Sequence, residues 1–154
     1  MRVLKRIWFW ICWPFLFFYF FRSERTRVIV RDGSKTLLVK GWWSRWYADE
    51  RWALPGGGLK HGEPTEIGAL RELAEEVGLT ARPEDLTPLG SGRVAEFGLG
   101  YKAHYFLLDL PAGQTPASQS AEVAELMWLD LSEISDTAAL KPEVLAARDL
   151  LVQG

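Results

Sequence analysis

The chain has 154 residues, a single cysteine and a net charge of −2, with 48% hydrophobic and 25% charged residues. This length fits one domain with a core large enough to fold alone, and one cysteine excludes an internal disulfide framework and argues against a zinc site. The charge is uneven, because residues 1–31 contain seven Lys or Arg and one Glu, whereas residues 32–154 contain eleven and nineteen Asp or Glu. Such an acidic body makes nucleic acid an improbable main partner.

The N-terminal stretch from Ile7 to Phe21 contains fifteen residues without a charge, ten of them aromatic, and basic residues flank it on both sides. As a helix it would reach about 22 Å, short of the roughly 30 Å of a bilayer core, and Pro14 would kink it. The stretch ends without the small residues of a signal-peptide cleavage site. These properties favour a segment that lies in the membrane interface, where aromatic rings and flanking cations are stabilised.

We therefore expect residues 1–22 to bind a membrane surface and the protein to lie in the cytoplasm at the inner face of a membrane. Three alternatives stay open: a short spanning helix, a signal peptide, and packing on the domain or on a second subunit of a homodimer. Cys12 is either a palmitoylation site or a small apolar residue.

Short β-rich runs follow at residues 27–31 and 36–40, and the Asp32-Gly33 dipeptide between them predicts a hairpin. The next loop carries four aromatic residues, which would stack on a base, cover the core or extend the membrane-facing surface: Trp42, Trp43, Trp46 and Tyr47. Residues 52–54 are predicted to form a short strand leading into Gly56-Gly57-Gly58, where the backbone can approach a metal ion or phosphate closely.

An amphipathic helix is predicted from Pro64, which suits a first helical turn, to Gly78, which suits the left-handed position after a helix end. Its apolar stripe is expected to consist of Ile67, Leu70, Ala74 and Val77.

Three carboxylates crowd another face of this helix, because Glu72, Glu75 and Glu76 stand three and four residues apart. Arg71 is the one cation of the helix that would relieve their repulsion. A hard divalent ion such as Mg²⁺ would convert the repulsion into binding, although a solvated acidic face is the alternative interpretation.

Further strands are predicted at residues 86–97, 101–110 and 122–129, and a helix at 143–151. His104 falls within a predicted strand and is expected to be a strand or surface histidine rather than a catalytic base. Strands on both sides of one long helix, together with a C-terminal helix, predict a mixed sheet between helices.

The central stretch fits the pattern G-x5-E-x7-R-E-U-x-E-E-x-G-U, where U is aliphatic. The matching positions are Gly57, Glu63, Arg71, Glu72, Leu73, Glu75, Glu76, Gly78 and Leu79. This pattern is the Nudix box, and the chain resembles a Nudix hydrolase. The resemblance implies an α/β/α sandwich with a mixed central sheet over residues 25–154, preceded by the hydrophobic segment at residues 1–24.

The resemblance also implies roles for individual residues. Glu72, Glu75, Glu76 and the Gly56 carbonyl are expected to bind Mg²⁺, with Mn²⁺ as a substitute, and Glu72 is alternatively the general base. Gly57 and Gly58 are expected to lie against the metal and phosphates. Arg71 is expected to orient the glutamates, and Glu63 to support them or bind a metal. Outside the box, Glu122 is the candidate for a further ligand or base, with Glu125 behind it.

The expected reaction is metal-dependent hydrolysis of the pyrophosphate bond in a nucleoside diphosphate linked to another moiety, X. The alternative is a membrane-tethered nucleotide-binding or regulatory module without turnover. The box faces the diphosphate, so the sequence does not specify X.

Overall fold

The computed structural model describes residues 23–41, 50–96, 99–132 and 137–153. The predictions for residues 1–22, including Cys12, and for the aromatic loop at residues 42–47 lie outside this part of the chain. Within it, no helix combines the length and apolar character that crossing a bilayer requires.

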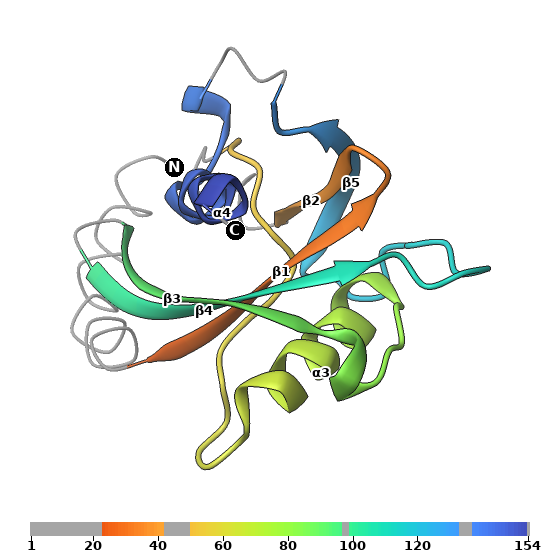
Figure 1. Cartoon of the computed structure of the whole chain (residues 1–154), viewed down its shortest axis with the longest axis horizontal. Coiled ribbons are helices and arrows are strands. Elements are labelled where there is room, and N and C mark those ends of the chain that lie inside the picture. Colours follow the sequence, from red (N-terminus) through yellow and green to blue (C-terminus); the bar gives the residue numbers. More distant parts are fainter. Residues whose placement is uncertain (1–22, 42–49, 97–98, 133–136, 154) are drawn as a thin grey trace, which may run out of the picture.

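Five strands form one mixed sheet in the order β3-β4-β1-β2-β5 (Figure 1). The strands are β1 (Glu24–Asp32), β2 (Lys35–Gly41), β3 (Thr87–Glu96), β4 (Leu99–Asp109) and β5 (Val123–Asp130). The central strands β1 and β4 are parallel, and the other neighbouring pairs are antiparallel. The mixed sheet predicted from the sequence is confirmed.

The first hairpin is tighter than the sequence predicted. Asp32 pairs with Lys35, so both belong to strands and only Gly33 and Ser34 form the turn. Gly33 has a φ of 60°, which glycine adopts without steric cost. The second hairpin is also shorter than expected, because β4 already begins at Leu99.

Two helices cover opposite faces of the sheet: α3 (Thr65–Val77) and α4 (Pro142–Gln153) (Figure 1). Alternate residues of β1 separate two cores, because Val28 and Val30 pack on the α3 side whereas Ile29 packs on the α4 side. Two 3₁₀ turns, Pro83–Asp85 and Thr137–Ala139, complete the elements of the described residues. The predicted α/β/α sandwich is confirmed.

The apolar stripe predicted for α3 is wrong in part. Ile67 is 46% exposed and Ala74 is also exposed, whereas Ala69, Leu73 and Val77 are fully buried against the sheet. The helix is rotated relative to the prediction, and this orientation buries Leu73 with Ala69 and Val77 while Glu76, next to this face, accepts a hydrogen bond from the Gly56 N–H. Apolar packing and this polar contact are thus both satisfied by the observed orientation.

The short strand predicted at residues 52–54 is also wrong, since only two isolated bridges form there: Ala53 with Val39 and Trp52 with Leu140. The reason is that β1 and β2 pair directly only near their hairpin. Residues 53–59, here called the glycine strip, bond first to β2 and then to β1. The strip stays too briefly beside each strand to form a regular ladder, and it delivers the glycines to the α3 side of β1.

The rotation of α3 is tested by truncating one residue on each face. Leu73→Ala removes a fully buried side chain and is expected to lower the free energy of unfolding by about 2–5 kcal/mol. Ile67→Ala, the matched control on the outer face, is expected to change it by only about 0.5 kcal/mol. Urea denaturation measures both, and a larger loss for Ile67→Ala would restore the stripe predicted from the sequence.

Candidate active site

The glycine strip is fixed to the first half of β1 by backbone hydrogen bonds. The Val28 N–H donates to the Pro55 carbonyl at 2.9 Å and the Thr26 N–H to the Gly57 carbonyl at 2.9 Å. Gly56 has a φ of 131°, and a Cβ there would lie 2.3 Å from the Thr26 carbonyl oxygen. Only glycine therefore allows the strip to pass this close to β1.

Gly57 is the point at which α3 and the glycine strip touch. A Cβ at Gly57 would lie 2.5 Å from the carboxyl atoms of Glu72. The Glu72 carboxylate thus occupies the space that any larger residue at this position would fill. Because Gly57 has no side chain, the strip is in direct contact with Glu72, one of the predicted metal ligands.

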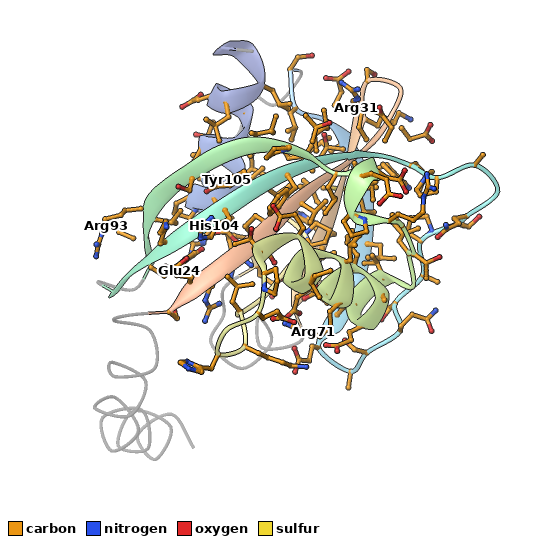
Figure 2. All side chains as sticks on the ribbon, turned by 60° about the horizontal axis from the view of Figure 1, so that its bottom comes forward. Glu24, Arg31, Arg71, Arg93, His104 and Tyr105 are labelled. Carbon is orange, nitrogen blue, oxygen red and sulfur yellow. The ribbon has the colours of Figure 1, made fainter. Side chains whose placement is uncertain are left out.

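Arg71 of α3 (Figure 2) binds several residues at once and connects the helix to the segment that precedes it in the sequence. Its Nε and Nη2 donate to the two carboxylate oxygens of Glu63 at 2.8 and 2.9 Å. Its Nη1 donates to Glu72 at 2.8 Å and to Glu75 at 3.3 Å, and Nη2 also reaches the Gly58 carbonyl at 3.0 Å. One planar guanidinium therefore binds three carboxylates and the strip, which its fork of donors permits and a lysine would not.

Glu63 is the most strongly held of these carboxylates. The bidentate bond from Arg71 and the bond from the Lys60 N–H lower the pKa of Glu63 to about 2. Glu63 accordingly stays charged over the whole neutral range and keeps Arg71 directed towards the strip. Glu75, in contrast, has a side chain that is 56% exposed and has only the long contact to Arg71.

Glu76 is in a different environment because it lies largely buried beneath α3. Burial raises the pKa of Glu76 to about 7, although the bond from the Gly56 N–H and the charge of Arg27 oppose this rise, and Glu72 and Glu122 add to it. The Gly56 N–H donates to Glu76 Oε2 at 2.8 Å. Glu72 and Glu76 thus contact two neighbouring glycines of the strip, Gly57 and Gly56 respectively.

A cavity of about 470 Å³ lies beside α3 and brings together four glutamates of the predicted site. The residues that line it are Glu72, Glu75, Glu76, Ser120, Ala121 and Glu122. Glu125 contributes elsewhere, since it forms an ion pair with Lys40 at 3.6 Å. His104 lies on β4 and contacts Glu24 of β1, away from these lining residues (Figure 2).

Glu122 reaches the cavity because the loop before β5 is clamped to the C-terminal end of α3. The Ala117 and Gln119 N–H groups donate to the Val77 and Glu76 carbonyls at 3.0 and 3.1 Å. The Gln114 amide exchanges two hydrogen bonds with the Thr80 backbone, at 2.8 and 2.7 Å. These contacts satisfy the last carbonyls of the helix and place the loop over its end.

The donor set fits a magnesium ion. Among the described residues, no group of three or more His, Cys, Asp or Glu side chains is placed to hold a metal ion by itself. Mg²⁺ does not require such a group, because it keeps several waters and is bound through one or two carboxylates together with substrate phosphates. The four carboxylates that line the cavity supply hard oxygen ligands of this kind. The Gly56 carbonyl accepts a hydrogen bond from Arg27 at 2.6 Å and is not among the residues that line the cavity.

Sequence reasoning missed two groups of residues around the site. Arg27 was placed in a strand and among the basic residues that follow the N-terminal hydrophobic segment, whereas the structure buries it at 5% exposure. Gln114 had no assigned role, and its contacts with Thr80 follow from tertiary packing. The only local signal for Arg27 is a charged residue directly before an apolar β run, Val28-Ile29-Val30.

Together, fold and site define a class of protein in which a glutamate-bearing helix packs on a glycine strip that runs beside the central strand of a mixed α/β/α sandwich. The family model described as NUDIX domain matches residues 22–151. Because this match covers most of the chain, the protein belongs to the Nudix hydrolase family.

Relatives with assigned names fall into several groups. The nucleoside triphosphatase NudI of Escherichia coli is 29% identical over 134 residues, which cover 84% of this chain and 90% of that protein. The RNA pyrophosphohydrolase of Aeromonas hydrophila is 32% identical over 87 residues, covering 47% of this chain and 49% of that protein. The chain spans about half or less of the length of this and two further RNA pyrophosphohydrolases that it matches.

Solved structures agree with the fold. A MutT Nudix hydrolase from Burkholderia pseudomallei superposes with a TM-score of 0.69 at 24% identity, covering 86% of this chain and 97% of the other. A UDP-X diphosphatase gives a TM-score of 0.62 at 23% identity, covering 86% and 62%. At these identities the likeness establishes the architecture alone.

The contact between Gly57 and Glu72 is tested by adding one methyl group. Gly57→Ala is expected to displace the Glu72 carboxylate and weaken Mn²⁺ binding at least about tenfold, a loss of about 1.4 kcal/mol. Gly92→Ala is the matched control, because a Cβ there has no atom within 4 Å. Titration calorimetry measures both variants, and equal affinities would show that the Glu72 position does not govern metal binding.

Proposed function

We propose that the protein hydrolyses the pyrophosphate bond of a nucleoside diphosphate linked to another moiety, X, with Mg²⁺ as its cofactor. The observation that carries this proposal is the cavity lined by Glu72, Glu75, Glu76 and Glu122 beside the glycine strip. Family membership supports the same reaction, and Nudix hydrolases generally use divalent metals. The names of the relatives point to substrates that share a phosphoanhydride and differ in the attached group.

In this proposal Glu72, Glu75 and Glu76 hold the ion together with the Gly56 carbonyl. When bound, Mg²⁺ neutralises the diphosphate and makes an adjacent water more acidic. The chain supplies the remaining requirements. The strip presents backbone rather than side chains at Gly57, which leaves room for phosphate oxygens. Arg71 keeps Glu72 and Glu75 in place through the bonds that also tie it to Glu63.

Glu122 is our candidate for the general base that accepts the proton of the attacking water. Its carboxylate lines the cavity and pairs with no cation among the residues that the structure describes, so its oxygens are available. Glu72 is the alternative base, but one of its carboxylate oxygens already accepts a hydrogen bond from Arg71 at 2.8 Å. We therefore expect Glu122→Gln to lower kcat by a larger factor than the factor by which it changes KM.

Glu76→Gln is expected to reduce kcat by about 10²-fold or more without unfolding the protein. The glutamine carbonyl can still accept the hydrogen bond of the Gly56 N–H, so the packing under α3 is retained while a charged ligand is lost. Glu84→Gln, in the 3₁₀ turn far from the cavity lining, is the control. Steady-state kinetics with circular dichroism decide, and full activity of Glu76→Gln would refute its assignment as a ligand.

The substrate is identified by a screen for phosphate or nucleotide release with Mg²⁺. The panel comprises nucleoside triphosphates, oxidised deoxynucleoside triphosphates, nucleotide sugars, ADP-ribose, dinucleoside polyphosphates and triphosphorylated RNA. We expect turnover on at least one compound. The absence of both turnover and Mn²⁺ binding would favour the alternative, a membrane-tethered nucleotide-binding or regulatory module.

We further propose that residues 1–22 attach the protein to an anionic membrane surface. The support is the sequence itself, in which basic residues flank ten aromatic side chains. Cosedimentation with vesicles of phosphatidylcholine and phosphatidylserine tests the proposal. The full chain should bind and a chain beginning at Ser23 should not, whereas equal behaviour of the two would contradict the assignment.

A further inference from the structure

A buried ion pair lies behind the glycine strip, on the opposite side of the sheet from α3. Arg27 of β1 is 5% exposed, and Glu143 in the first turn of α4 is fully buried. Arg27 Nε and Glu143 Oε1 are 3.3 Å apart. The two charges belong to elements far apart in the sequence, and neither is part of the Nudix box.

Arg27 connects this ion pair directly to the strip. Its Nη1 donates to the Gly56 carbonyl at 2.6 Å and to the Thr26 carbonyl at 3.0 Å. Gly56 is therefore held on both sides: its carbonyl by Arg27 and its N–H by Glu76. A shift of Arg27 would move the residue whose N–H orients Glu76.

Tyr101 of β4 completes the arrangement. Its hydroxyl donates to Glu143 Oε2 at 3.2 Å and lies 3.5 Å from Arg27 Nη2. The Arg27 guanidinium also stands over the Tyr101 ring, 5.7 Å from its centroid. The guanidinium thus has fixed partners on β1, β4, α4 and the strip, which leaves it little freedom to choose another rotamer.

The start of α4 is also attached to Trp52, the residue immediately before the strip. The Lys141 N–H donates to the Trp52 carbonyl at 2.8 Å, and the Trp52 N–H donates to the Ala139 carbonyl at 2.9 Å. Backbone hydrogen bonds therefore connect the segment before α4 to the residue from which the strip begins, independently of the side chains of Arg27 and Glu143.

Stability alone does not account for a buried ion pair at this position. Well-packed apolar residues of similar size often replace such pairs without loss, because desolvating two charges offsets much of their attraction. A guanidinium differs from an apolar side chain in that it can donate to the strip carbonyl while its charge lies next to a carboxylate, here at 3.3 Å without a hydrogen bond between Arg27 Nε and Glu143 Oε1.

We propose that Arg27 is a positioning residue for the active site, oriented by Glu143 and acting through Gly56. In this arrangement α4 controls the geometry of the glycine strip, and hence of Glu76, from the opposite face of the sheet. The inference deepens the proposed function, on which its catalytic consequence rests.

The test uses three variants of the full chain. Arg27→Met combined with Glu143→Met removes both charges together, so that no buried charge is left unpaired. Arg27→Lys keeps the charge but has one ammonium in place of the fork, and it serves if the double variant does not fold. Val144→Ala, a fully buried residue next to Glu143, is the control for loosening α4 without removing a hydrogen bond to the strip.

Three readouts separate positioning from stability. Hydrogen exchange of the Gly56 amide should accelerate at least tenfold more than that of core amides in the double variant. The affinity for Mn²⁺, measured without substrate, should fall about tenfold. The value of kcat should fall by a larger factor than the factor by which KM changes. Arg27→Lys should give intermediate values, and Val144→Ala should lower Tm while leaving all three readouts at the level of the unaltered protein.

Wild-type exchange at Gly56 and wild-type Mn²⁺ affinity in a folded double variant, or in Arg27→Lys, would overturn the proposal. The exchange and Mn²⁺ measurements do not depend on turnover. If the unaltered chain hydrolyses nothing, the proposed function fails while the positioning role of Arg27 is still decided by these two readouts.

Discussion

Backbone hydrogen bonds between the glycine strip and β1 are the constraint on which the site depends. They place Gly56 and Gly57 so close to the strand that a side chain at Gly56 would collide with the Thr26 carbonyl. The space left free above the strip is filled by carboxylates of α3. The positions of α3, of the glycine strip and of the α3 carboxylates therefore depend on one another, so a shift of one would require a shift of the other two.

Electrostatics at the site follow from this geometry. Bringing Glu72, Glu75 and Glu76 to one end of a cavity is unfavourable unless cations offset the repulsion. Arg71 offsets the repulsion by its hydrogen bond to Glu72. Arg27, which is bonded to the Gly56 carbonyl, offsets it by placing its positive charge near Glu76. The side that faces the cavity is left with uncompensated negative charge, which is the condition under which a divalent cation binds favourably.

Much of the fold was predictable because its signals are local. Alternating strands, the cap at Gly78 and the C-terminal helix all appear where the sequence places them, and the box brought Glu72, Glu75 and Glu76 to one cavity with Glu122. The buried face of α3 was predicted wrongly because Ile67 and Ala74 are apolar yet lie on the outer side. The observed orientation buries Ala69, Leu73 and Val77 instead and lets Glu76 accept the Gly56 N–H bond, and helical periodicity alone does not choose between the two faces. The positions of Arg27 and Gln114 depend on partners distant in the sequence, so composition and spacing did not reveal them.

The parallel pairing of β1 with β4 has a consequence for how the protein is made. β1 leaves the ribosome early, whereas Tyr101, Tyr105 and Glu143 are synthesised much later, so β1 has no parallel neighbour while the helix bearing the glutamates emerges. Contacts between distant parts of a chain form slowly, because a large loop must close first. A nascent chain that ends before β4 should therefore leave β1 without its parallel neighbour and expose an aggregation-prone strand edge.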